Sequence, residues 1–413
     1  PPSGDPKAEL QMLVAALDYD NYLGQVAIGR ISRGTMHLGD TVSLIDRENT
    51  ITNHKLERIF VFKGMERVSE TEAIAGDIVA ITGPENVSIG NTIASTESPD
   101  ALPSIEVDEP TVRMTFGVNT SPFMGKEGVH CTSRTLHERL LRELRTDVSL
   151  QVDSTDTPDV FVVSGRGELH LSILVETMRR EQYEFQVSRP EPVNKMVDGH
   201  LHEPYEILNI TTKEEYIGAL TGYLSEHLGL MQDMTYDDHG NVSLEYKIPT
   251  RGLIGFNAYF LRVTRGDGVK NSFFHSYELK KGEIKRQQSG VLVSAETGVA
   301  VTYGLLNAQG RGDTFIDPGT MVYEGMIIGS HRREGNIEIN VCKEKKMTNI
   351  RSSTSDIAER LNATIRMSLE EALEFISDDE LVEITPENFR MRKMRLSALD
   401  RKRERRHGGN SRG

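Results

Sequence analysis

Short apolar segments alternate with glycine-containing turns over residues 1–100. These segments are rich in valine, isoleucine and leucine, and they lie at residues 13–17, 25–31, 41–45, 55–62 and 78–81. Glycines such as Gly24, Gly39 and Gly64 separate them at spacings too short for helices, a pattern typical of strands joined by tight turns. We therefore expect a small closed β-barrel over residues 1–100, with a linker at 98–103, where two prolines occur.

The next part of the chain alternates between strand-like and helix-like patterns. In the helix expected at 133–146, leucines such as Leu136 and Leu140 recur at helical spacing. The order β-α-β-β-α-β is that of a ferredoxin-like, split βαβ domain, which we place at residues 108–190. Its other expected elements are a helix at 168–182 and strands at 111–118, 148–152, 159–163 and 184–187.

The same order of elements then recurs, which predicts a second ferredoxin-like domain at residues 200–283. Thr212 and Glu215 have the spacing of a capping box at the start of its first helix, and Gly229 is a candidate stop signal. The expected strands are 205–210, 231–236, 242–248 and 270–277, and the expected helices are 213–228 and 251–264.

Residues 284–395 are expected to form a fourth, mainly β domain, followed by a basic tail at 396–413. One helix is indicated by the capping-box spacing of Ser368 and Glu371 and by the apolar residues after it. The expected strands are 291–294, 299–305, 325–330 and 337–341, with a strand-like run at 382–395. Taken together, the pattern predicts a multidomain α+β protein.

Composition narrows the class of protein further. No apolar run approaches the roughly 18 residues of a membrane-spanning helix, and the first residues lack the charged and apolar regions of a signal peptide. Cys131 and Cys342 are the only cysteines, too few for a disulfide framework or a cysteine metal cluster. We expect a cytoplasmic protein with no membrane contact and no metal site.

Positive charge is concentrated at the C-terminal end. The net charge of the chain is −14, but the residues from Arg390 onward include ten lysines and arginines and two acidic residues, a net charge of +8. The rest of the chain therefore carries −22. An acidic body with a basic end is typical of a protein that touches a polyanion through one region. A solvated, disordered tail is the alternative.

Several segments resemble the translational GTPases of the elongation factor G group. Residues 22–31 with 38–40 resemble the second-domain barrel of those factors, and residues 164–171 resemble the strand-turn-helix signature of their third domain. Residues 203–206 and 274–278 resemble their fifth domain. The resemblance implies a translation-factor β-barrel (domain II-like), two ferredoxin-like split βαβ domains (domain III-like and domain V-like) and a mainly β C-terminal domain.

The BipA/TypA family is favoured within this group. Only residues 188–202 separate the two ferredoxin-like domains, where elongation factor G has a whole further domain. BipA/TypA and LepA factors lack that domain, and residues 345–351, 378–386 and 390–393 resemble BipA/TypA. The chain is thus similar to the C-terminal portion of this family, without the GTP-binding domain. A LepA-like factor and a GTPase-independent RNA-binding ribosome assembly chaperone are the alternatives.

Motifs for nucleotide chemistry are missing from the sequence. No segment has the form Gly-x-x-x-x-Gly-Lys-Ser/Thr of a phosphate-binding loop. Residues 194–198, Asn-Lys-Met-Val-Asp, have one residue too many for the guanine-reading pattern of GTPases. We expect no catalytic residue in this chain and no GTP hydrolysis by it. The resemblance implies that GTP and magnesium bind in a domain that precedes Pro1.

The basic segments supply the candidate RNA-binding residues. Lysine and arginine bind phosphate, while threonine and asparagine can hydrogen-bond ribose or a base edge. The resemblance implies that the loop at 343–351 lies near the acceptor end of a ribosome-bound tRNA. It also implies binding to ribosomal RNA and ribosomal proteins, with roles in ribosome assembly and in adaptation to cold or other stress. The alternative is a solvated lysine loop. The candidates are Lys343, Lys345, Lys346, Thr348, Asn349, Arg351, Arg332, Arg333, Arg390, Arg392 and Lys393.

Overall fold

A computed structural model describes residues 4–20, 22–64, 66–104, 109–237, 240–284, 290–344 and 360–408 of the chain. The chain forms two compact units. One consists of Pro1–Glu109 with His137–Val152, and the other of Pro110–Leu136 with Asp153–Gly413. None of the helices within the described ranges is long and apolar enough to cross a membrane.

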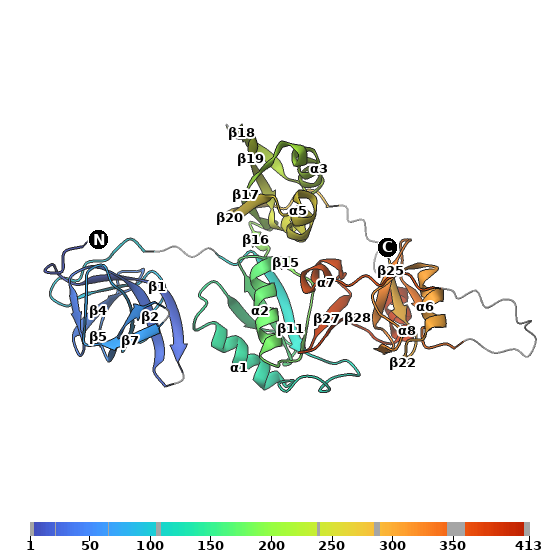
Figure 1. Ribbon diagram of the computed structural model, residues 1–413, viewed down its shortest axis with the longest axis horizontal. Helices are drawn as coiled ribbons and strands as arrows, with labels where there is room; N and C mark the ends of the chain where they lie inside the picture. Colours follow the sequence, from blue (N-terminus) through green and yellow to red (C-terminus); the bar gives the residue numbers. More distant parts are fainter. Residues whose placement is uncertain are drawn as a thin grey trace, which may run out of the picture. The chain divides into compact units, whose positions relative to one another are not determined.

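The first unit contains an eight-stranded antiparallel sheet that curls around one core (Figure 1, blue). Met12, Ile31, Ile59, Val79 and Ile93 are fully buried inside it. The strand order is β5-β4-β10-β1-β2-β9-β6-β7, and a separate pair is formed by β3 (Thr35–His37) and β8 (Glu72–Ile74). The eight strands are β1 (Gln11–Asp20), β2 (Gly24–Arg33), β4 (Thr41–Ile45), β5 (Ile51–Lys55), β6 (Arg58–Lys63), β7 (Glu66–Glu70), β9 (Ile78–Thr82) and β10 (Thr92–Ser95).

A second sheet has the order β12-β13-β11-β14-β27-β28. Its central strands pack against α2 (Glu168–Arg180), which buries Leu171, Leu174 and Met178. The ring of Phe116 stacks on that of Phe185, with centroids 5.7 Å apart. The strands of this sheet include β11 (Val112–Val118), β12 (Gln151–Ser154), β13 (Val160–Gly165), β14 (Phe185–Val187) and β15 (Glu191–Pro192), which pairs with β11. Helix α1 (Ser133–Glu143) lies between β11 and β12 in the sequence.

The last two strands of that sheet come from the far end of the chain. β27 (Glu380–Ile384) pairs with β14, and β28 (Phe389–Lys393) pairs with β27. The strand-like run expected at 382–395 is therefore a hairpin. It extends the sheet of the domain III-like part, although the sequence pattern assigned these residues to the fourth domain.

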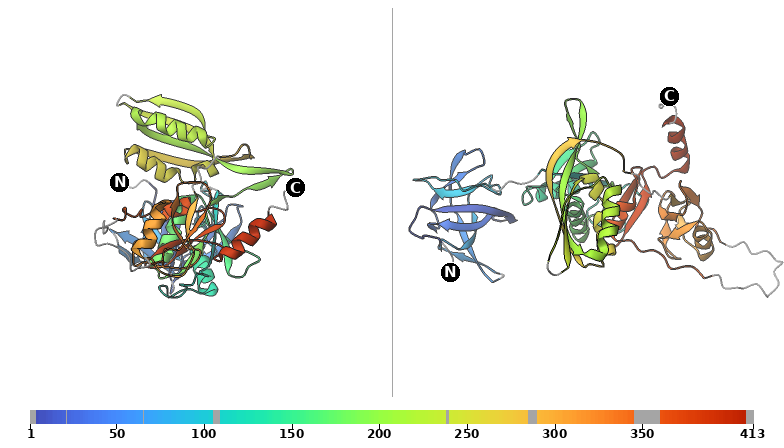
Figure 2. Two further views of the ribbon diagram at one scale, coloured as in Figure 1. Left: turned by 90° about the vertical axis from the view of Figure 1, so that its right-hand side faces the viewer. Right: turned by 90° about the horizontal axis from the view of Figure 1, so that it is seen from above.

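A third sheet is built from β16 (Lys195–Val197), β17 (His200–Lys213), β18 (Leu230–Tyr236), β19 (Asn241–Pro249) and β20 (Gly268–Leu279). Two helices, α3 (Ile217–Glu226) and α5 (Phe256–Thr264), cover one face of it (Figures 1 and 2). Their buried side chains, such as Leu220 and Phe260, meet Leu208 and Leu244 from the strands. This sheet shares no described strand with the sheet of β11.

The two predicted helices of this domain are present, but their boundaries differ from the prediction. Strand β17 continues to Lys213, a short 3-10 helix follows at Glu214–Tyr216, and α3 begins only at Ile217. Thr212 caps no helix, because its hydroxyl donates to the carbonyl oxygen of Asp267 (3.3 Å). The helix expected at 251–264 is interrupted at Gly255, whose φ of 85° separates α4 (Thr250–Leu253) from α5.

The C-terminal domain has a four-stranded sheet of order β23-β25-β21-β26 around its own core (Figure 1, orange). The strands are β21 (Val291–Ser294), β23 (Gly312–Thr314), β25 (Ile327–His331) and β26 (Ile337–Ile339), and a small pair joins β22 (Gly298–Val299) to β24 (Met321–Val322).

The helices of this part differ from expectation in two places. The strand expected at 299–305 is mostly wrong, because α6 occupies Thr302–Gln309 and turns Leu305 and Ala308 into the core. The basic end forms α8 (Ala398–Gly408). The capping box of α7 (Leu369–Phe375) is confirmed, since Ser368 Oγ accepts from the Glu371 amide and the Glu371 carboxylate accepts from the Ser368 amide.

Close packing of α6 gives a first prediction. A Cβ at Gly304 would lie 2.2 Å from the carbonyl oxygen of Val341. Gly304→Ala should lower the free energy of unfolding by about 1–3 kcal/mol, because the backbone must shift to admit the methyl group. Differential scanning calorimetry measures the change. Gly222→Ala, in α3 with open space around it, should instead be stabilising by about 0.5–1 kcal/mol. Equal effects of both substitutions would contradict the described packing.

Candidate nucleic-acid interface

Arg332 and Arg333 occupy an exposed turn between β25 and β26. The Arg332 side chain is 61% exposed, and its Nη2 lies 3.9 Å from Asp313 Oδ1, a long and solvent-screened ion pair. Because such a pair contributes little, the guanidinium can exchange the carboxylate for a phosphate at small cost. The turn thus fits the predicted contact with RNA.

Arg311 is a neighbour of this turn that the sequence interpretation missed. Its carbonyl oxygen accepts a hydrogen bond from the Arg332 amide (3.1 Å), so the two residues lie side by side at the ends of paired strands β23 and β25. Gly312 permits this pairing, because a Cβ there would lie 1.8 Å from the Ser330 carbonyl oxygen. The fold brings three exposed arginines to one end of the sheet: Arg311, Arg332 and Arg333. We call these three residues the arginine turn.

Lys343, the first residue of the other predicted loop, lies elsewhere in this domain. Arg332 and Arg333 precede β26, whereas Lys343, which is exposed, follows it, so the two groups flank opposite ends of that strand. The remaining candidates of the loop lie outside the described residues: Lys345, Lys346, Thr348, Asn349 and Arg351.

Helix α8 carries the basic end of the chain. Arg401 is buried at its base, where Nη1 donates to the Arg395 carbonyl oxygen (2.6 Å) and Nη2 to Glu338 on β26 (3.2 Å). Lys402 and Arg403 are exposed to solvent. One arginine thus fixes the helix to the sheet while its neighbours present positive charge outward.

Lys393 and Arg392 do not fit the predicted role in RNA binding, because each is 1% exposed. The Lys393 ammonium lies 2.6 Å from Glu380 Oε1 and 3.0 Å from Asp379 Oδ2. Arg392 Nη2 donates to Thr120 Oγ1 (2.7 Å), and burial lowers the pKa of its guanidinium below the usual value. These cations neutralise the acidic residues around them, so a phosphate could reach them only after the hairpin had unfolded.

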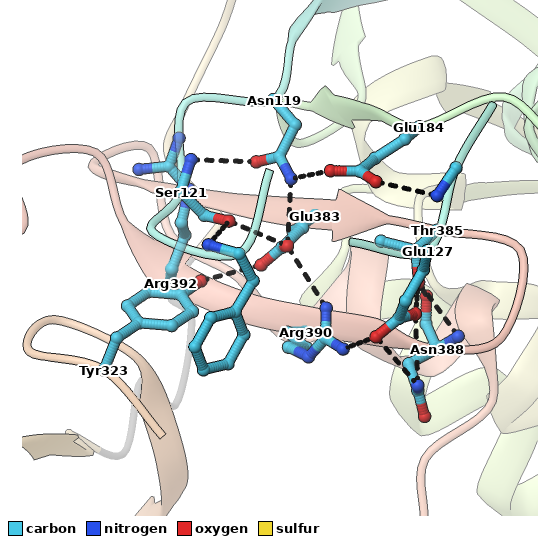
Figure 3. Close-up of polar contacts among 12 residues, drawn as sticks. Asn119, Ser121, Glu127, Glu184, Tyr323, Glu383, Thr385, Asn388, Arg390 and Arg392 are labelled. Atoms are coloured by element: carbon cyan, nitrogen blue, oxygen red, sulfur yellow. Dashed lines mark hydrogen bonds and ion pairs between the residues drawn. The ribbon is translucent and has the colours of Figure 1, made fainter. Parts of the chain in front are cut away.

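Glu383, on β27, is the centre of the cluster that also holds the third predicted cation of this segment, Arg390 (Figure 3). Its carboxylate is fully buried and accepts from Asn119 Nδ2 (2.9 Å), Ser121 Oγ (2.8 Å), Tyr323 OH (2.8 Å) and Arg390 Nη1 (3.2 Å). Burial and the charge of Glu383 raise the pKa of the Tyr323 phenol, which therefore remains a donor.

Two further carboxylates hold the loop at residues 119–128. Glu184 accepts from Asn119 Nδ2 (2.8 Å) and from the amides of Gly125 (2.8 Å) and Gly128 (3.0 Å). Glu127 pairs with Arg390 and accepts from Thr385 Oγ1. Burial raises the pKa of Glu127, but the Thr385 hydrogen bond and the Arg390 charge outweigh burial and hold it below its usual value. The loop is therefore fixed by charge and hydrogen bonds from both sides.

This buried cluster positions chain segments, and its polar groups are used in contacts between them. Three parts of the second unit meet in it: the loop at 119–128, the β27–β28 hairpin and Tyr323 of the C-terminal domain. Among the described residues, no group of histidine, cysteine or carboxylate side chains could hold a metal ion. The solvent-facing candidates for binding are the arginine turn, Lys343 and α8.

Family comparisons assign the domains to a class of protein. Residues 24–94 match the family model for elongation factor Tu domain 2, and residues 200–288 match the elongation factor G C-terminus. Residues 289–398 match the TypA/BipA C-terminal domain. A barrel followed by an elongation factor G-like domain places the chain among the translation factors with a multidomain α+β fold.

Comparison with curated relatives identifies the family of translation factors to which the chain belongs. The large ribosomal subunit assembly factor BipA of Synechocystis sp. is 48% identical over 97% of this chain and 67% of the relative. Factors of the same name from Bacillus subtilis and Haemophilus influenzae are 46% and 47% identical over 97% and 98% of this chain, covering 66% of each. The chain belongs to the BipA family, which decides against the LepA alternative. It spans about two thirds of the length of these relatives.

The buried cluster gives the second prediction. Glu383→Gln keeps the shape of the side chain but removes the charge that faces Arg390, so it should lower the free energy of unfolding by about 3 kcal/mol or more. Urea unfolding followed by circular dichroism measures this. Glu387→Gln, at an exposed position in the same hairpin, should change stability by no more than about 0.5 kcal/mol. A Glu383→Gln variant as stable as the control would remove Glu383 from the centre of the cluster.

Proposed function

We propose that the chain is the ribosome-binding portion of a BipA factor and that it takes part in assembly of the large ribosomal subunit. The observation that carries this proposal is the 48% identity, over 97% of the chain, to a factor named for that process. The elongation factor Tu-like and elongation factor G-like domains support association with the ribosome, since both belong to translation factors.

The proposed contact with ribosomal RNA runs through the C-terminal domain. A chain of net charge −14 is repelled by RNA as a whole, so binding requires a local concentration of positive charge. The arginine turn supplies it, with three exposed guanidinium groups that can each bind a phosphate through two hydrogen bonds. Lys343 and the basic residues that follow it are proposed to contact the acceptor end of tRNA.

The remaining functions of the whole factor are proposed by family membership. GTP hydrolysis, with its magnesium ion, is assigned to the part of the relatives that this sequence does not span. Action in the cytoplasm, and a role in adaptation to cold or other stress, complete the proposal. RNA and protein surfaces of the ribosome are its proposed partners.

The arginine turn gives the third prediction. Changing Arg311, Arg332 and Arg333 together to alanine should weaken binding to ribosomes by at least about tenfold near physiological salt. Fewer counterions are released, so the slope of log affinity against log salt should fall by up to about three. Sedimentation with purified ribosomes across a salt series measures both.

A matched control separates these contacts from net charge. The triple change of Lys63, Lys213 and Arg366 to alanine removes the same charge from three other exposed positions. It should alter affinity and slope much less. Equal losses in both triple variants would reject the arginine turn as the contact. A third variant with Lys345, Lys346 and Arg351 changed to alanine tests the loop by its affinity for tRNA-loaded ribosomes.

The fourth prediction concerns nucleotide binding. Isothermal titration of this chain with GTP and magnesium should show no saturable binding, because the sequence holds no phosphate-binding loop. Saturable binding would place a nucleotide site within these domains. It would contradict the proposal that GTP binds only in the part of the relatives that this sequence does not span.

A further inference from the structure

Carboxyl groups from two helices converge on the start of α5. Glu168 is the first residue of α2, and Glu370 and Glu374 lie on α7. Together with Gly255 and Asn257 they line a cavity of about 20 Å³, which has room for about one water molecule. Segments of the domain III-like, domain V-like and C-terminal parts thus meet around one small cavity, into which three carboxyl-bearing side chains reach.

Gly255 is the point of closest contact in this junction. Its amide donates to Glu168 Oε2 (2.9 Å), so a carboxylate from α2 caps the helix that begins at the next residue. A Cβ at Gly255 would lie 2.4 Å from the carboxyl carbon of Glu374, which shows how closely the second carboxyl group approaches. The positive end of the α5 dipole favours one negative charge at this place. A second negative charge, on Glu374, would be repelled by the first, on Glu168.

Acidic groups outnumber basic groups around this contact. Arg262 of α5 and Lys270 of β20 are the cations that face it, and Tyr223 of α3 adds a phenol. The carboxyl groups come from α2, β17 and α7: Glu168, Glu206, Glu370, Glu371 and Glu374. Full ionisation therefore leaves uncompensated negative charge in a partly desolvated space, which weakens the junction.

We propose that the contact of Glu168 and Glu374 with the start of α5 is a pH-sensitive latch, closed when Glu374 is protonated and loosened when it is ionised. In the closed state a neutral Glu374 lies beside Glu168 without repulsion, and Glu168 accepts from Gly255. In the loosened state the two carboxylates repel each other, and α5 loses its cap. The latch is independent of RNA binding and of the proposed ribosomal function.

The direction of the pH dependence follows from the surroundings of Glu374. Burial, and then the charge of Glu168, raise the pKa of the Glu374 carboxyl from its ordinary 4.5 to about 7. Between these two values the closed state binds more protons than the open state, so rising pH opens the latch across this window. Above about pH 7 both states are ionised and the opening reaches its full extent. Solvent screening reduces the effect of this partly exposed carboxyl. We therefore expect the equilibrium constant for opening the latch to rise by at least about tenfold across this window.

Amide hydrogen exchange of the whole chain, read by mass spectrometry, gives the fifth prediction. In peptides that cover residues 252–258, protection corrected for the intrinsic exchange rate should fall at least about tenfold between pH 5 and pH 8. Glu374→Gln, which mimics the protonated carboxyl, should reduce this fall to less than half on a logarithmic scale, the remainder coming from Glu168, whose pKa is also raised by burial. Glu226→Gln, at an exposed position of α3, should behave as the unaltered chain. Peptides from β17 and β19 report whether each variant is folded.

Two results would overturn the latch. One is protection at 252–258 that does not change with pH in the unaltered chain. The other is a Glu374→Gln variant whose protection falls as steeply as that of the unaltered chain. If Glu374→Gln fails to fold, Glu168→Gln provides the test, since its amide oxygen can still accept from Gly255 while one of the two repelling charges is gone. Its protection should then fall by less than half as much on a logarithmic scale, and an unchanged fall rejects the latch.

Discussion

A fully buried carboxylate must be surrounded by donors, and Glu383 sets this requirement for the second unit of the chain. Its partners come from segments that lie far apart in the sequence: Asn119 and Ser121, Tyr323, and Arg390 on the facing strand. Loss of these donors would leave the buried charge of Glu383 unpaired, which costs far more free energy than the loss of one ordinary contact. The pairing of β27 with β14 and the conformation of residues 119–128 are thereby fixed together.

The same requirement divides the basic residues of the C-terminal region by role. Arg392 and Lys393 are buried against acidic side chains, and Arg401 attaches a helix through carbonyl oxygens. Arg332 and Arg333, by contrast, extend into solvent. A count of lysines and arginines cannot separate structural cations from those that face a partner, because their difference lies in which carboxylates the fold brings near them.

Local signals in the sequence were reliable, and signals that depend on distant residues were less so. The Ser368 capping box was predicted correctly because all its atoms lie within one turn, whereas Thr212 has the same spacing and is used by a strand. The apolar run that ends at Leu305 has the local pattern of a strand, but its contacts with the C-terminal core place most of it in helix α6. Arg311 could not be linked to Arg332, because only the strand register makes them neighbours.

The pairing of β14 with β27 has a consequence for the order of folding. Asn119 and Glu383 are 264 residues apart in sequence, so the contact that completes this sheet closes a very long loop. During synthesis the edge of β14 stays without its partner strand until β27 has left the exit tunnel. The domain III-like part is therefore among the first of these domains to be synthesised and among the last to be finished, and its open edge is the surface that a nascent-chain chaperone would need to cover.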